Sequence, residues 1–376
     1  MSNKLKYLFL TSLLSLSFLS SCSNDSTSSL SKKLFFSELY NGESINDCVL
    51  EIGTTSENEL SLNGITINFY NSNEISYSYL FKDETISKNK LVLFVNDYSS
   101  YTNDFSSLIK LDDNYICGRY YAEMVDDKGK IIDTIGYKGV SIDYVRDGSL
   151  IRLNEYRKGR DEFETLDYIS FRSGYDKNLG ILDCPLSLDE VLNGPSLDES
   201  RYGGLGFAKG NKATNGYSKV SILSLGDGDT THFKFPKEDG ISDDYSSRVR
   251  YLLINTPEID HGDDSIKEEP YGKDAQKFNN ERLKKATLIV VQSAKDESLK
   301  DTYGRTLGFV WYTDKENPKI SDLKLLNFEL VKEGLAKLSD GDYKTLFDKD
   351  VLYQDYFKYA KTKAEKERKN IYSLLS

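Results

Sequence analysis

The residues best suited to chemistry lie in three short segments that are far apart in the chain, residues 226–230, 250–258 and 301–305. Together these segments contain carboxylates, one amide, and the guanidinium groups of Arg250 and Arg305. Oxygen ligands suit a hard divalent cation, and an arginine can bind two phosphate oxygens at once. If the fold brings the segments together, they could hold a cation and a phosphodiester side by side.

The second segment contains a proline that orients its neighbours. Pro257 fixes its own backbone and favours an extended conformation at Thr256. This orients the Asn255 side chain, the Thr256 carbonyl and the Glu258 carboxylate. Arg250 lies five residues before Asn255, so in a regular strand the two side chains would point to opposite faces. We therefore expect a bulge or barrel curvature to bring both to one phosphate.

The first segment carries less information by itself. Asp227 and Asp229 flank Gly228 just before an expected strand. Turns of this kind are common on protein surfaces, so the segment alone predicts only a turn. Its meaning depends on the residues that the fold places beside it.

Strands and helices alternate in the region that must position these segments, residues 219–376. Apolar runs predict five short strands, at residues 220–225, 233–235, 249–255, 288–291 and 307–312. Helical spacing predicts three helices, over residues 271–285, around Leu323, Leu326 and Leu330, and around Leu352, Tyr356, Ala360 and Ala364. This pattern predicts a five-stranded OB-fold barrel with three helices, a fold that often binds oligonucleotides.

The upstream part of the chain has a different pattern. Over residues 33–192, alternating apolar residues such as Ile65, Ile67 and Phe69 are separated by frequent turn residues, which predicts a mainly β structure, a sandwich. Residues 193–218 are rich in Gly, Asn and Ser and predict a flexible linker between the two domains.

The N-terminus reads as a targeting segment. In residues 1–21, Lys4 and Lys6 precede an apolar run that is too short to span a bilayer comfortably. Its ending at Cys22 resembles the bacterial lipoprotein signal, in which the cysteine becomes lipid-modified; the alternative is an ordinary cleaved signal. Residues 22–32 then form a polar tether. We expect a lipid anchor at Cys22 on the extracellular face of a bacterial membrane.

Three further cysteines, Cys48, Cys117 and Cys184, allow one disulfide and one free thiol in an oxidising compartment. Their spacing matches no zinc pattern. Burial as small apolar residues is an equally good interpretation, so the sequence leaves the pairing open.

Composition gives weak evidence about partners. The formal net charge is −11, whereas proteins that act on nucleic acid usually present a basic face. Most of the excess acid lies upstream of residue 218, and a bound dication would change the local charge. The acidity therefore argues only weakly against a nucleic-acid substrate.

Taken together, the three segments resemble the staphylococcal nuclease family, over about residues 220–373. The resemblance depends on Gly-Asp-Gly-Asp-Thr, then Arg-(four residues)-Asn-Thr-Pro-Glu, then Asp-Thr-Tyr-Gly-Arg, in order and at suitable spacing. It implies calcium as the cofactor, DNA and RNA as substrates, and phosphodiester hydrolysis that leaves 3′-phosphate ends. It also implies a role for each matched residue: Asp229, Asn255 and the Thr256 carbonyl as calcium ligands, Asp227 behind them, Glu258 as general base, Arg250 and Arg305 on the phosphate, and Tyr303 on a phosphate of bound nucleotide.

The chain departs from the family pattern at three positions. Asn255 replaces a ligating carboxylate, so we expect weaker calcium binding. Thr302 stands where the family often has a phosphate-binding lysine, and Asp340 where it often has a base-stacking tyrosine, although Tyr343 is close by. These departures leave open a second hypothesis, a non-catalytic surface lipoprotein that binds nucleic acid or another macromolecule.

A second resemblance covers the upstream domain, roughly residues 33–188. Residues 36–42 with 50–52, 132–137 and 148–153 are similar to lamin-tail-type immunoglobulin-like domains. This resemblance implies a β-sandwich but no defined ligand. The leading hypothesis is thus a monomeric, calcium-dependent nuclease that is anchored at the outer cell surface and carries a lamin-tail-like domain.

Overall fold

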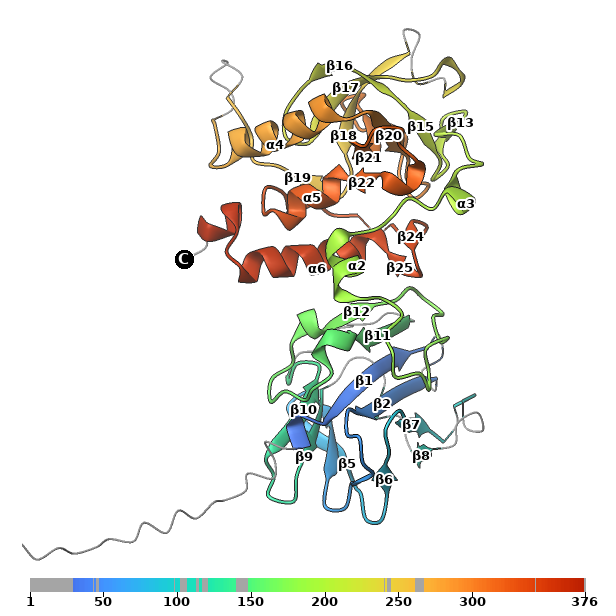
Figure 1. Cartoon of the computed structure of the whole chain (residues 1–376), viewed down its shortest axis with the longest axis vertical. Coiled ribbons are helices and arrows are strands. Elements are labelled where there is room, and N and C mark those ends of the chain that lie inside the picture. The colour runs from blue at the N-terminus through green and yellow to red at the C-terminus, as the bar shows by residue number, and fades with distance from the viewer. Residues whose placement is uncertain are drawn as a thin grey trace, which may run out of the picture.

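The computed structural model describes residues 30–42, 44, 47–97, 99–101, 107–112, 115–116, 121–139, 148–239, 241, 245–260, 267–341 and 343–374. Within this part the protein is mainly β with a few short helices, as expected (Figure 1). None of its helices is long and apolar enough to cross a membrane. The expected signal peptide and Cys22 lie outside the described residues.

The upstream unit consists of two sheets that share one hydrophobic core. The larger sheet has the order β12 (Tyr168–Ser170), β11 (Gly148–Arg152), β1 (Leu34–Asn41), β2 (Cys48–Thr54), β7 (Val92–Asn96), β8 (Leu108–Leu111). The smaller sheet has the order β10 (Ile131–Ile135), β9 (Ala122–Val125), β4 (Thr66–Asn71), β5 (Glu74–Leu80), with β3 (Leu60–Ser61) and β6 (Thr85–Ile86) as a separate pair. Two layers around one core agree with a β-sandwich. The lamin-tail resemblance stays a prediction.

The downstream unit is a closed barrel of five strands. Strands β15 (Tyr217–Lys219) and β16 (Ser221–Leu225) are separated only by Val220 and act as one bent strand. This strand pairs at one end with β20 (Leu288–Gln292) and at the other with β17 (Thr230–Lys234), and β18 (Ser246–Tyr251) and β21 (Thr306–Thr313) complete the circle. Strands β18 and β21 run parallel and the other barrel pairs antiparallel. This is the expected OB-fold barrel.

Helices and short hairpins surround the barrel. The helices are α4 (Gly272–Lys285), α5 (Leu326–Lys332) and α6 (Tyr353–Lys366), as expected, together with α2 (Leu188–Asn193) and α3 (Glu199–Tyr202). The remaining short strands are β13 (Ala208–Lys209), β14 (Lys212–Ala213), β19 (Ile254–Asn255), β22 (Lys324–Leu325), β23 (Lys337–Leu338), β24 (Phe347–Asp348) and β25 (Val351–Leu352). Helix α4 lies beside β16 and β17, where the first chemical segment is found (Figure 1).

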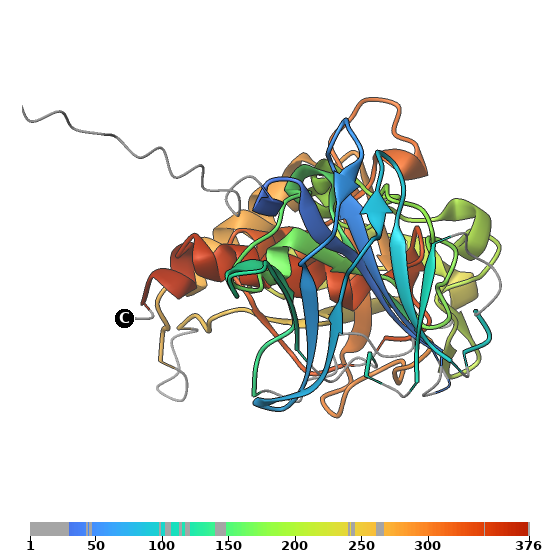
Figure 2. The same cartoon turned by 90° about the horizontal axis from the view of Figure 1, so that it is seen from below.

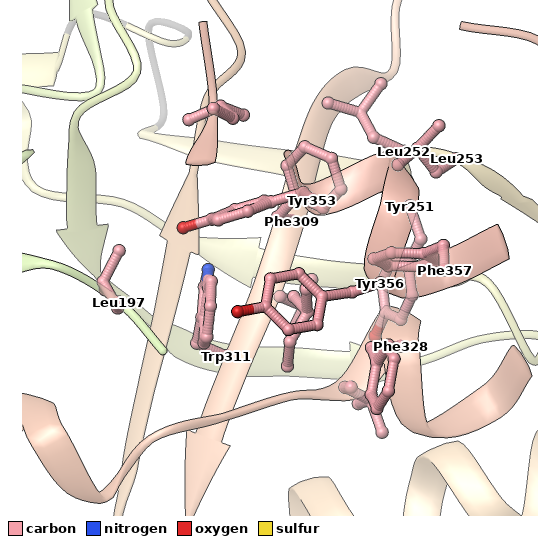
Figure 3. Packing of buried hydrophobic residues seen from close by; sticks show 14 of the residues in the cluster. Leu197, Tyr251, Leu252, Leu253, Phe309, Trp311, Phe328, Tyr353, Tyr356 and Phe357 are labelled. Carbon is pink, nitrogen blue, oxygen red and sulfur yellow. The ribbon is translucent and has the colours of Figure 1, made fainter. Parts of the chain in front are cut away.

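Aromatic side chains join the barrel to α6. Trp311 of β21 is fully buried, and its Nε1 donates to Gln292 Oε1 at 3.1 Å. The rings of Phe309 and Trp311 meet that of Tyr353, and Phe328 of α5 meets Phe357 (Figure 3). This packing makes α6 part of the barrel core.

The opposite side of α6 contacts the upstream unit (Figures 1 and 2). The Tyr359 hydroxyl donates to the Leu166 carbonyl at 2.7 Å. Nearby, the Arg172 guanidinium pairs with Asp350 at 2.7 Å and the Arg172 backbone N–H donates to the Asp350 carbonyl. The β-sandwich thus packs against the barrel through α6.

Residues 193–218 differ from the expected flexible linker. Tyr202 and Phe207 are buried in the barrel core, and β15 is a barrel strand. A Cβ at Gly216 would clash with the carbonyls of Leu205 and Gly206, so glycine there permits a close backbone approach. The segment is held by its buried aromatic side chains and by β15, so the prediction of a flexible linker was wrong.

The structure describes two of the four cysteines. Cys48 is disulfide-bonded, and Cys184 is a buried free thiol. Cys22 and Cys117 lie outside the described residues. One disulfide and one free thiol is among the arrangements that the sequence allows.

Candidate active site

The loop of Asp227, Gly228 and Asp229 is held tightly between two neighbours. A Cβ at Gly228 would lie 2.8 Å from Thr256 Oγ1 and 2.8 Å from the Ala275 Cβ of α4. Both distances are too short for a real Cβ, so the loop can approach Thr256 and α4 this closely only with glycine. The Asp-Gly-Asp sequence is thus a packed element and more than a surface turn.

A buried polar network connects the same loop to α4. Asn279 of α4 donates from Nδ2 to the Asp227 carbonyl at 2.9 Å and to Thr231 Oγ1 at 3.2 Å. Its Oδ1 accepts from the Tyr251 hydroxyl at 2.9 Å, which also lies 3.0 Å from Thr231 Oγ1. Because all three side chains are fully buried, each bond replaces water that is no longer available.

Sequence reasoning missed this network. Asn279 is in register with Ala275 and Leu283, four residues away on either side, on the buried face of α4. A polar residue on an otherwise apolar helical face was the available signal, since a buried amide must be hydrogen-bonded.

Asp229 is the point where the first two segments meet. Its buried carboxylate accepts the Thr256 backbone N–H at 2.8 Å and pairs with the guanidinium of Arg250. The second guanidinium nitrogen of Arg250 donates to Asn255 Oδ1 at 2.5 Å. One arginine therefore bridges Asp229 and Asn255.

A turn, instead of the expected bulge or barrel curvature, brings Arg250 and Asn255 together. Strand β18 ends at Tyr251, Leu253 adopts a left-handed conformation with φ of 65°, and β19 begins at Ile254. The Asn327 side chain holds this turn by donating to the Leu252 carbonyl at 2.9 Å. Because the chain changes direction between Arg250 and Asn255, the strand alternation that separates them no longer applies.

Glu258 lies exposed at the edge of this cluster. Its backbone N–H donates to Glu269 Oε2 at 3.0 Å. Partial desolvation beside the loop raises the pKa of Glu258, the negative charges of Asp229 and Asp227 raise this pKa further, and Arg250 opposes them. The carboxylate is thus close enough to the loop to respond to its charges, and water can reach it.

The third segment forms a tight loop that orients Arg305. Asp301 accepts the backbone N–H groups of Tyr303 and Arg305 at 3.0 and 2.9 Å, and its carboxylate pairs with the Arg305 guanidinium at 2.7 Å. Gly304 has φ of 77°, which suits glycine. Tyr303 is 83% exposed at the tip of the loop.

Arg250 and Arg305 line the same groove, which has a volume of about 330 Å³. The parallel register pairs Val249 with Thr306 and Arg250 with Leu307, so Arg305, which directly precedes β21, lies beside this part of β18. Tyr303, Thr302, Asp340 and Tyr343 also line the groove. The structure thus joins all three segments, with Arg250 shared by the groove and the carboxylate cluster.

Comparison with known proteins agrees with this geometry. Residues 248–374 match the family described as staphylococcal nuclease homologues. The chain is 30% identical over 168 residues to the thermonuclease of Staphylococcus hyicus, which covers 45% of this chain and 80% of that relative. It is 31% identical over 130 residues to the thermonuclease of Staphylococcus intermedius, which covers 35% and 66% of the two chains. This chain belongs to the staphylococcal nuclease family.

The structure adds a part of the site that lies outside the family match. Asp227 and Asp229 precede residue 248, where the match begins. Their hydrogen bonds to Asn279, Thr256 and Arg250 nevertheless place them in the same cluster.

The oxygen atoms beside Asp229 suit a hard cation better than a transition metal. Within the described residues there is no group of three or more His, Cys, Asp and Glu side chains that could hold a metal ion. Asp229, the Asn255 amide and the Thr256 carbonyl are oxygen donors on adjoining segments, which is the chemistry that calcium prefers. His232 lies half-buried on β17, and His261 lies outside the described residues.

Proposed function

We propose that this protein is a calcium-dependent phosphodiesterase that hydrolyses DNA and RNA. The observation that carries the proposal is the position of Arg250, which contacts Asp229 and Asn255 and also lines the groove that contains Arg305. A phosphodiester in this groove would meet two guanidinium groups next to a cluster of oxygen ligands. Family membership and similarity to two thermonucleases support the same activity.

Asp229, Asn255 and the Thr256 carbonyl would hold the cation, with Asp227 behind them. A bound divalent cation would supply positive charge to a phosphodiester that gains negative charge as it reacts. Asp229 and Asn255 are bridged by Arg250 in this structure, so the same oxygens are already grouped around a positive charge. The amide at Asn255 carries no charge, and this favours a calcium site of reduced affinity.

Arg250 and Arg305 would bind the scissile phosphate. Asp301 holds the Arg305 guanidinium in place, so little side-chain freedom is lost when the phosphate binds. Guanidinium groups that are oriented in advance stabilise the developing charge without reorganisation at the moment of reaction. Tyr303, exposed beside Arg305, would contact a neighbouring phosphate.

Glu258 would act as the general base toward the attacking water. Its raised pKa makes its carboxylate a better proton acceptor, and its exposure gives water access. The family resemblance further implies that the 5′-oxygen leaves and that 3′-phosphate ends remain.

We also propose a location for this activity. A lipid anchor at Cys22 would hold a monomeric enzyme at the outer face of a bacterial membrane. The lamin-tail-like domain would lie between the tether and the barrel, since it precedes the barrel in the chain.

A cleavage assay tests the proposal. The purified chain is incubated with single-stranded DNA and with RNA, in calcium and in a chelator. We expect cleavage only with calcium and its loss in Glu258→Ala and Arg305→Ala. Saturable binding without cleavage at any calcium concentration would contradict the proposal and favour a non-catalytic binding lipoprotein.

A further inference from the structure

A second groove, with a volume of about 550 Å³, lies on the segment that the sequence predicts to be a linker. Its lining includes Arg201, Lys209, Lys212 and Lys295, and no carboxylate lines it. This is unusual for a chain with a net charge of −11. The groove is thus a local site of positive charge on an acidic protein.

Hydrogen bonds to the barrel hold this groove in shape. Ser293 Oγ donates to the Phe207 carbonyl at 2.6 Å and accepts the Thr214 backbone N–H at 3.1 Å. Asn215 Oδ1 accepts the Lys295 backbone N–H at 2.7 Å and the Thr345 hydroxyl at 3.2 Å. Both walls of the groove are therefore anchored to each other.

Three of the four positive charges of the groove are available to a ligand. Lys209, Lys212 and Lys295 are exposed, and none of them forms an ion pair within the described part of the chain. The Arg201 guanidinium lies 3.9 Å from the centre of the Phe347 ring. Its Nε forms an ion pair with Asp198 at 3.5 Å. Stacking on the ring limits its rotation and presents its remaining donors.

Residues two positions apart in the sequence line this groove and the groove of Arg250 and Arg305. Lys295 lines the basic groove, and Glu297 lines the other. Likewise, Thr345 lines the basic groove, and Tyr343 lines the other. Two residues of extended chain span at most about 7 Å. At these two places, therefore, the backbone that lines one groove lies within about 7 Å of the backbone that lines the other.

We propose that the basic groove binds the sugar–phosphate backbone of a nucleic-acid strand whose scissile bond lies between Arg250 and Arg305. This inference rests on the proposed nuclease function. Three of its cations, Arg201, Lys209 and Lys212, belong to the segment before residue 248, where the family match begins. The one aromatic residue in its lining, Tyr202, is buried, which favours contacts to phosphate over stacking of bases.

The test compares two triple variants with the same change in charge. Lys209→Gln/Lys212→Gln/Lys295→Gln neutralises the groove, and Lys82→Gln/Lys90→Gln/Lys128→Gln neutralises three exposed lysines of the upstream unit. Binding of a 20-nucleotide single-stranded DNA is measured in chelator over a range of salt concentrations. Cleavage of the same DNA and of a dinucleotide is measured in calcium.

The groove variant should show a salt dependence of log Kd that is shallower by about 2, since each phosphate contact on a single strand contributes about 0.7. The advantage of the wild type should therefore change roughly 20-fold between 50 and 200 mM salt. The KM for the 20-nucleotide DNA should rise while kcat and dinucleotide cleavage stay unchanged. The upstream variant should behave like the wild type.

An unchanged salt dependence in the groove variant would overturn the inference even if the wild type cleaves DNA. Equal losses in both triple variants would also overturn it, because they would show an effect of net charge alone. A wild type that cleaves nothing would overturn the proposed function, and the binding measurement would still decide the role of the groove.

Discussion

The two units of this molecule each place acidic side chains close together, but the surroundings of these side chains differ. In the β-sandwich, Glu38 of β1 lies directly across from Glu51 of β2, and both are fully buried. In the barrel, the charges of Asp229 and Glu258 influence each other, and Arg250, which pairs with Asp229, also lines a groove. Both acids of the first pair are closed to solvent, whereas Glu258 of the second is exposed.

Neutral groups donate hydrogen bonds to the acids of the sandwich. Ser149 Oγ and Asn178 Nδ2 donate to Glu38, the latter at 3.0 Å, and the Gly180 backbone N–H donates to Glu51 at 2.6 Å. Burial raises the pKa of Glu38 to about 7, although the hydrogen bonds from Ser149 and Asn178 lower it. Burial also raises the pKa of Glu51, and the charge of Glu38 raises that pKa further. These acids hold the covering segment that contains Asn178 and Gly180.

The comparison shows that buried or perturbed carboxyl groups do not by themselves mark a functional site. Burial raises the pKa of Glu38 to about 7, yet its side chain is fully buried and does not reach solvent. What distinguishes Asp229 and Glu258 is the guanidinium group of Arg250 beside them, together with the exposure of Glu258.

Removing Arg305 should cause the largest loss. Arg305→Ala should lower kcat/KM by about 10³-fold or more, because one of two guanidinium groups on the phosphate disappears. Arg305→Lys should recover only part of the activity, since a lysine cannot bind two oxygens at once. Lys324→Ala, which removes one exposed positive charge on β22, is the control and should retain full activity. A loss of less than tenfold in Arg305→Ala would argue against a role in binding the scissile phosphate.

Glu38 should affect stability and its dependence on pH, with no effect on catalysis. Its pKa is about 7 in the folded chain against a reference value of 4.5, so the folded state retains a proton that the unfolded state loses. The stability contributed by the protonated carboxyl is therefore complete below about pH 4.5 and is lost as the pH rises to about 7, by about 3 kcal/mol.

Glu38→Gln should flatten this dependence. The free energy of unfolding is measured with denaturant from pH 4.5 to 8 for the wild type and for the variant. The difference between the two values should change with pH. A constant difference would mean that Glu38 does not titrate in the folded protein. Cleavage by the variant should equal that of the wild type.

Gly228→Ala should distort the open cluster. The added Cβ would lie 2.8 Å from atoms of Thr256 and Ala275, so the loop must move at a cost of about 1–3 kcal/mol. Both the melting temperature and kcat should fall. Gly204→Ala is a matched control because its Cβ would meet no atom within 4 Å. Equal behaviour of the two variants would show that the close packing of the loop is unimportant.

Asn255→Asp should have the smallest effect and should improve the site. A carboxylate at this position adds a charged ligand, so the calcium concentration for half-maximal cleavage should fall roughly tenfold. Asn255→Ala should raise it. If neither change moves the calcium requirement, Asn255 does not bind the cation.

Much of the barrel could be predicted from local pattern. The strands and α4 follow apolar spacing that is visible along the chain, and the predicted helix over residues 271–285 differs from α4 by one residue. The residues of the site were predictable because three motifs occur in order. Their meeting point at Arg250 was not, since it depends on which strands are neighbours.

Tertiary contacts account for the rest. A left-handed Leu253 is locally unfavourable and is stabilised by the barrel, so nothing in the sequence marks the turn. The fixed segment around Phe207 has the composition of a linker and is ordered by burial of its aromatic side chains. The basic groove is formed by lysines that are far apart in sequence, at positions 209, 212 and 295.

The most direct test of the catalytic site compares kcat/KM for single-stranded DNA, in saturating calcium, between Glu258→Ala and Glu38→Gln. We expect a loss of about 10²-fold or more for Glu258→Ala and a change of less than about twofold for Glu38→Gln. Undiminished cleavage by Glu258→Ala, or an equal loss in both variants, would contradict the claim that the open cluster of the barrel is the catalytic site.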